Sequence, residues 1–241
     1  MKISIIVPAF NEEKFLGETL AQIKSAAGAF TRIGWETELI VCDNRSTDRT
    51  AEIARAAGAT VVVEPVNLIS RARNTGAAAA TGDWLVFVDA DSHPGGELFA
   101  DVIKEIQSGD CIAGGAIFRW DQPTFNTRLW MPILNVGFRW RQMVNGPFIF
   151  VERRVFQTVG GFNPDIFVGE DLELGGRLKE LARETGKRFV ILHRHPIVTS
   201  ARRFPEYSAL TPLRVLYHIL FKPMVFITDR EKARRWYHGR R

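Results

Sequence analysis

The chain has 241 residues, of which 46% are hydrophobic and 24% charged, and this composition excludes a disordered chain and fits one large globular domain. The net charge is +5, and residues 194–241 carry eleven Lys and Arg against three Asp and Glu, which could attract an anion but does not identify it. The two cysteines, Cys42 and Cys111, lack metal-site spacing and exclude a disulfide-rich scaffold, so buried reduced thiols are expected.

Strand-like and helix-like segments alternate through the first half of the chain. Strands are predicted at residues 3–8, 38–43, 60–63 and 84–88, with helices after the first three, the third at residues 70–80. Pro8 should stop the first strand, Asn11 should cap the first helix with Glu12 and Glu13 in its first turn, and Gly58 should end the second. Four such alternations predict a doubly wound, mostly parallel α/β sheet.

The second half is less regular. Strands are predicted at residues 111–118, 147–151 and 189–192, and a helix at 170–185 that ends at Gly186. Residues 125–144 are aromatic and basic and form an irregular helix or loop. Because the sequence begins directly with a strand, we expect no signal peptide and a cytoplasmic protein, free or peripheral on the cytoplasmic face of a membrane.

Acidic side chains follow three of the four strands of the first half: Glu12, Asp43, and the pair Asp89 and Asp91. Ligands bind beyond the carboxyl ends of strands in open α/β sheets, so these acids should share one edge. Like charges repel, and a divalent cation or a donor-rich ligand would offset that repulsion. The alternative is that Asp89 and Asp91 form a turn and cap the next helix.

Five short motifs occur in order at the ends of these elements: Val7–Glu13, Asp43 with Ser46–Asp48, Arg71 with Arg73–Gly76, Asp89–Asp91, and Gly160–Phe162 with Gly169–Leu174. With them, residues 3–203 resemble the family 2 glycosyltransferases. The resemblance implies a GT-A-type α/β fold, with a nucleotide-binding parallel half and a mixed acceptor-side half. We expect that domain in residues 1–212, divided at residue 94, followed by an amphipathic and basic extension in residues 213–241.

The resemblance also implies transfer of one sugar, with inversion, from a nucleotide-diphosphate sugar to an acceptor hydroxyl. Processive members carry a Gln-x-x-Arg-Trp segment, which this sequence lacks, so a single transfer is favoured. Arg202 and Arg203 lie in the corresponding part of the chain and are candidates to neutralise the diphosphate. The donor-binding residues carried over in this way are Pro8, Ala9, Phe10, Glu12, Asp43, Arg71, Asp89, Ala90, Asp91, Arg202 and Arg203.

By the same resemblance Asp91 and Asp89 would bind Mn²⁺ or Mg²⁺, which neutralises the leaving diphosphate. Inversion needs one base, and Asp171 is preferred to its neighbour Glu170. Each residue also has a structural alternative. Glu170 and Asp171 could simply be favourable acids in the first turn of a helix, and Asp43 could form a turn. Arg71 and Arg73 could lie on a solvated helix face.

Other functions fit less well. A phosphatase would place Asp-x-Asp after the first strand, and a nucleotidyltransferase would open with a glycine-rich loop. A catalytically weak relative that binds sugar nucleotides stays an alternative, and no nucleic-acid partner is expected because the basic end lacks a known motif. Residues 213–227 are too short and polar to span a bilayer. They should pack on the core or lie in a membrane interface, which would suit a lipid-linked acceptor.

Overall fold

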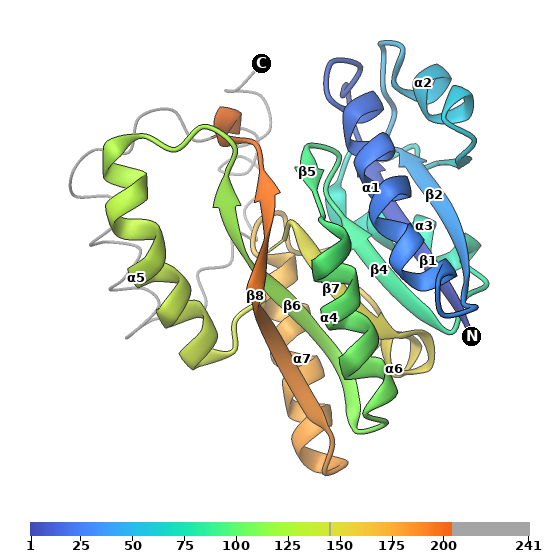
Figure 1. The fold of residues 1–241 in the computed structure, drawn as a ribbon. Helices are drawn as coiled ribbons and strands as arrows, with labels where there is room; N and C mark the ends of the chain where they lie inside the picture. Colours follow the sequence, from blue (N-terminus) through green and yellow to red (C-terminus); the bar gives the residue numbers. More distant parts are fainter. Residues whose placement is uncertain (145, 204–241) are drawn as a thin grey trace.

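A computed structural model describes residues 1–144 and 146–203 of the chain (Figure 1). Its centre is one eight-stranded sheet with the order β3-β2-β1-β4-β7-β6-β8-β5. The strands are β1 (Lys2–Ala9), β2 (Glu36–Asp43), β3 (Thr60–Val63), β4 (Trp84–Val88), β5 (Ser92–His93), β6 (Cys111–Trp120), β7 (Phe148–Glu152) and β8 (Arg188–Thr199). The helices are α1 (Leu16–Thr31), α2 (Thr50–Ala56), α3 (Ile69–Ala79), α4 (Gly96–Gln107), α5 (Phe125–Arg141), α6 (Arg153–Thr158), α7 (Glu170–Glu184) and the short η1 (Ala201–Arg203).

The first four long strands of the chain are parallel, as the alternation of strands and helices predicts. β4 lies in the middle of the sheet, and all five of its residues are buried, which explains its uninterrupted apolar sequence. The carboxyl ends of β1, β2 and β4 therefore meet at one edge, where the polar motifs follow them. The parallel half of the predicted sheet is confirmed.

The second half of the sheet is mixed, also as predicted. β7 runs antiparallel to both β4 and β6, and β8 runs parallel to β6. Because Val88 at the end of β4 pairs with Phe148 at the start of β7, the loop before β7 lies at the edge where the polar motifs gather. This reversal brings Gly146 beside residues that come much earlier in the sequence.

Apolar side chains fill both faces of the sheet. One layer includes Leu20 of α1 and Phe99 of α4, and the other includes Leu174 and Leu178 of α7. α3 packs closely, as its small residues predict. A methyl group at Gly76 would lie only 2.5 Å from Cγ2 of the buried Ile6.

Two predictions near the start of the chain are wrong. α1 begins at Leu16, so Asn11 does not cap it, and Glu12 and Glu13 precede the helix. Asn11 instead adopts a left-handed φ of 54° and accepts a hydrogen bond from the backbone N–H of Thr47. The Asn11 side chain, which the sequence pattern assigns to a helix cap, thus binds the loop after β2 instead.

Other boundaries also differ from the prediction, and the largest difference is that β8 continues to Thr199 instead of ending at residue 192. β1 continues through Pro8 to Ala9, because beyond Ile6 it pairs with β2 alone and one of its edges needs no donor. Asp91 does not cap a helix, since β5 follows it directly and α4 begins only at Gly96. The predicted helix at residues 213–227 lies outside the described residues.

We expect Gly76→Ala to lower the free energy of unfolding by about 1–3 kcal/mol, because the added methyl group would lie 2.5 Å from Cγ2 of the fully buried Ile6. Gly28→Ala is the matched control, since Gly28 is also helical but a methyl group there meets nothing within 4 Å. That variant should be neutral or stabilised by up to about 1 kcal/mol. Urea denaturation of both measures the difference, and equal stabilities would contradict the close packing of α3.

Candidate active site

Arg73 of α3 lies at the centre of the candidate site. Its side chain is only 1% exposed, and it donates hydrogen bonds to Asp89 Oδ1 at 2.8 Å and Glu170 Oε1 at 2.7 Å. It also donates to the carbonyl oxygen of Gly146 at 3.1 Å, and its guanidinium carbon lies 5.1 Å from the ring centroid of Phe162. A buried cation needs such partners to offset its lost hydration. The alternative of a solvated helix face is therefore wrong for Arg73.

The carboxyl groups around Arg73 have perturbed acidities. Burial and the neighbouring Asp171 raise the pKa of Glu170 to about 7, although Arg73 opposes that shift. Burial also raises the pKa of Asp171, while Arg73 and backbone N–H donors act against it. For Arg73 burial alone would lower the pKa, but Asp89 and Glu170 outweigh it, so the guanidinium stays charged.

Arg73 and the neighbouring carboxyl groups pack closely around Gly146, which has no side chain of its own. A side chain beginning at Gly146 would lie 3.3 Å from Asp171 Oδ2, 3.4 Å from Arg73 Nη2 and 3.8 Å from Asp89 Oδ2. The next residue of α3, Asn74, holds the backbone of Phe162 through two hydrogen bonds of 2.8 and 2.9 Å. Two adjacent residues of one helix thus join three of the predicted motifs.

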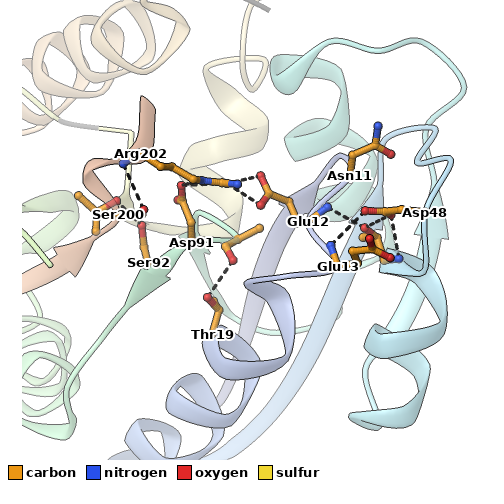
Figure 2. A network of polar contacts seen from close by, with 12 residues as sticks. Asn11, Glu12, Glu13, Thr19, Asp48, Asp91, Ser92, Ser200 and Arg202 are labelled. Carbon is orange, nitrogen blue, oxygen red and sulfur yellow. Dashed lines mark hydrogen bonds and ion pairs between the residues drawn. The ribbon is translucent and has the colours of Figure 1, made fainter. Parts of the chain in front are cut away.

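A second arginine joins two further acids at the same edge of the sheet. Figure 2 shows Arg202 between the carboxylates of Glu12 and Asp91, which it contacts as an ion pair with each. Its guanidinium carbon lies 4.2 Å from the ring centroid of Phe15. Arg202 reaches this position because the backbone N–H of Ser200 donates to the Asp91 carbonyl at 3.1 Å.

Asp43 and Arg71 have local partners. Asp43 accepts a hydrogen bond from the backbone N–H of Ser46 at 3.0 Å, as its turn-forming alternative predicts. Arg71 pairs with the buried Glu64 at 3.2 Å while its own side chain stays 45% exposed. Sequence reasoning missed Glu64, because it lies in no motif and its burial depends on the fold.

The four acids that the sequence places at this edge do not form one cluster. Arg202 pairs with Glu12 and Asp91, whereas Arg73 pairs with Asp89. In the part of the chain that the structure describes, no three His, Cys, Asp or Glu side chains converge to hold a metal ion. The donors at the end of β4 are carboxylate oxygens, which suit Mg²⁺ or Mn²⁺, and phosphate oxygens commonly complete such sites.

The donor-binding candidates Pro8 and Ala9 end β1, Phe10 follows it directly, and Ala90 comes shortly after β4, at the same edge of the sheet. Thr19 of α1 donates to the carbonyl oxygen of Ala90 at 2.8 Å, which fixes the turn between Asp89 and Asp91. The placement of these backbone segments agrees with a ligand site beyond the carboxyl ends of the strands.

Comparison with known proteins identifies the family. Residues 4–160 match the family described as glycosyl transferase family 2. The chain belongs to that family. The resemblance that the five motifs indicate is therefore confirmed, and the mixed α/β sheet is the GT-A fold.

Among individual relatives, the chain is 31% identical over 135 residues to a dolichol-phosphate mannosyltransferase of Pyrococcus furiosus, covering 50% of this chain and 36% of that protein. It is 39% identical over 97 residues to a glucosyl-3-phosphoglycerate synthase of Mycolicibacterium smegmatis, covering 37% of this chain and 30% of that protein. The match thus spans well under half the length of either relative.

Solved structures show the same fold. The mannosyltransferase PcManGT of Pyrobaculum calidifontis, in complex with GDP-Man and Mn²⁺, has a TM-score of 0.68 at 20% identity over 91% of this chain and 70% of that chain. S. aureus TarS 1–349 has a TM-score of 0.65 at 17% identity over 92% of this chain and 73% of that chain.

We expect Arg73→Met to lower the free energy of unfolding by about 3–5 kcal/mol, because it leaves the Asp89 and Glu170 carboxylates without their buried partner. Arg71→Met is the matched control on the same helix and should cost less than about 1 kcal/mol, since its ion pair is partly exposed. Denaturant titration measures both values. A small loss for Arg73→Met would contradict its central role.

Proposed function

We propose that the chain is an inverting, metal-dependent glycosyltransferase that moves one sugar from a nucleotide-diphosphate sugar to an acceptor hydroxyl. The observation that carries the proposal is the junction at Arg73, where Asp171 lies close to the end of β4 that carries Asp89. A base and a donor-side carboxylate would then both lie beside one buried cation. Neighbouring structures in complex with GDP-Man and Mn²⁺, or with UDP and Mn²⁺, support this assignment.

On the donor side, Asp91 and Asp89 would hold Mg²⁺ or Mn²⁺, and the ion would supply positive charge for the leaving diphosphate. The end of β1 and the residues after it, with Asp43 at the end of β2, would bind the base and ribose. Arg71, Arg202 and Arg203 would contact the phosphates. Because Arg202 pairs with Asp91, the arginine and the cation would compete for one carboxylate. Glu12 also pairs with Arg202 and would compete with the phosphates for this arginine.

Asp171 is the better candidate for the catalytic base. Glu170 is bound to Arg73 at 2.7 Å and is needed to keep that cation in place. Asp171 follows it at the start of α7, where burial raises its pKa and makes it a stronger proton acceptor. Glu170 would therefore hold Arg73 in position, and Asp171 would take the proton of the attacking hydroxyl.

The acceptor that we propose is a lipid-linked hydroxyl, reached by a cytoplasmic protein in peripheral contact with a membrane. The dolichol-phosphate mannosyltransferase of Pyrococcus furiosus supports the lipid-borne part of this choice, since its name specifies a lipid phosphate. Within residues 1–144 and 146–203, no helix has both the length and the apolar character needed to cross a bilayer.

We expect Asp171→Asn to lower kcat by about 10²–10⁴-fold while leaving the affinity for the nucleotide diphosphate unchanged, because a base acts on the acceptor. Glu170→Gln is the comparison, and it should mainly lower stability, since it weakens the pair with Arg73. Transfer assays and calorimetry with UDP or GDP and Mn²⁺ separate the two effects. Transfer by Asp171→Asn within a few-fold of wild type would reject it as the base.

The pH dependence should follow from the raised pKa of Asp171. The base works only as a carboxylate, so kcat should fall as the pH decreases through that pKa. The acidic limb of the kcat profile should then lie above the ordinary aspartate value of about 3.9. A limb at or below that value, measured with saturating donor and acceptor, would show that the proton acceptor is an unperturbed group.

For the metal site, Asp91→Asn should abolish Mn²⁺-dependent binding of the nucleotide diphosphate, whereas Arg202→Gln should raise the affinity for Mn²⁺ alone by removing a competing cation. Calorimetric titration with MnCl₂, and then with UDP or GDP, measures both. Arg188→Gln, a change in a partly exposed ion-pair network at the start of β8, serves as the charge-matched control. Unchanged Mn²⁺ affinity in Arg202→Gln would mean that the arginine and the ion do not share Asp91.

A further inference from the structure

α5 has apolar side chains on two opposite faces. Its inner face packs on the sheet, where Leu134 is buried and Phe138 stacks on Phe118 of β6 with ring centroids 6.3 Å apart. Asn135 also donates to the Phe118 carbonyl oxygen at 3.1 Å. In Figure 1 the helix lies at the margin of the fold, beside β6 and β8. An apolar outer face on such a helix requires a partner.

The outer face of α5 carries five large apolar residues, each at least 43% exposed: Phe125, Leu129, Ile133, Val136 and Trp140. We call them the α5 stripe. At about 100° per residue, their spacing places all five within an arc of roughly 80°. Only two other large hydrophobic residues in the described part of the chain are at least 43% exposed, Met1 and Val63, and neither belongs to α5. The stripe is therefore a continuous surface feature.

The surroundings of the stripe are strongly basic. α5 contains Arg128, Arg139 and Arg141 and no acidic residue. A cavity of about 760 Å³ beside it is lined by seven Lys and Arg but only two acids, Asp101 and Glu105. Burial and the charges of Arg141 and Arg183 lower the pKa of Lys179 in that cavity, which reflects the surplus of positive charge.

We propose that α5 lies in the interface of an anionic bilayer, with the α5 stripe among the acyl chains and the basic cavity facing the headgroups. An in-plane helix that combines Trp, Phe and Leu on one side with flanking arginines has the pattern of interfacial helices. Arg139 and His193 line both this basic cavity and an apolar one of about 460 Å³ under the helix, so the charged and apolar surfaces adjoin.

The position of α5 also connects the bilayer to the active site. The segment between β6 and α5 contains Asp121, whose side chain accepts a hydrogen bond from the backbone N–H of Ala201 at 3.0 Å. Its backbone N–H donates to the Thr199 carbonyl oxygen, also at 3.0 Å. Thr199 and Ala201 lie within the three residues that precede Arg202. Delivery of a lipid-borne acceptor by the docked surface rests on the proposed function. Docking to the bilayer does not.

Vesicle flotation of the full chain tests the proposal, with phosphatidylcholine vesicles that contain or lack phosphatidylglycerol. The wild type should bind the anionic vesicles and lose binding in high salt, because salt screens the charges. The double variant Leu129→Ser/Val136→Ser should bind at least about tenfold more weakly, since two apolar side chains no longer enter the bilayer. Ile33→Ser/Val63→Ser is the matched control, with two exposed side chains distant in sequence from α5, and should bind like wild type.

Two results would overturn the proposal. Equal binding by both double variants would place the contact elsewhere, for example in the basic residues 204–241. Strong protection of Trp140 from acrylamide quenching without vesicles, judged against Trp140→Phe, would show that another segment of the chain covers the stripe. Either result would leave the proposed glycosyl transfer untouched, because transfer to a water-soluble acceptor is measured separately.

Discussion

The buried guanidinium of Arg73 is the interaction on which the site depends. A charge that is 1% exposed is tolerated only because two carboxylates and a carbonyl oxygen surround it. Those partners come from β4, from the loop before β7 and from α7, which are distant in sequence. The cation therefore fixes α7 against the end of β4, and Asp171 takes its position from that junction.

The two arginines of the site differ in how firmly they are held. Arg73 is enclosed by the fold, whereas the Arg202 side chain is 28% exposed and belongs to the short η1 at the end of β8. Both neutralise acids that would otherwise repel one another. Arg73 thus has the character of a permanent structural cation, whereas under the proposed function Arg202 would be the one that a metal ion or diphosphate displaces.

Much of the architecture could be predicted because its signals are local. The apolar run of β4, the alternation around it and the small residues of α3 each determine one element, and the five motifs placed the polar residues at the correct edge. Other features depend on contacts that no local pattern contains. Asn11 follows β1 like a helix cap, yet it serves the loop that contains Thr47.

The roles of the two arginines of α3 show the same limit. Arg71 and Arg73 are about 200° apart around the helix, so one must face inward, but the sequence does not say which. The choice is made by the antiparallel β7, which brings Gly146 to the buried side. Likewise, the acids were expected to meet one another, and only the fold shows that arginines lie between them.

The central claim is that Asp89 and Glu170 act through one shared cation. A double-mutant cycle in the free energy of unfolding tests it most directly, using Asp89→Asn, Glu170→Gln and the double variant. Each single variant leaves Arg73 one of its two paired carboxylates, and the double variant leaves neither. The account predicts that the double variant loses about 1 kcal/mol or more beyond the sum of the single losses. Additive losses, within about 0.3–0.5 kcal/mol, would contradict it.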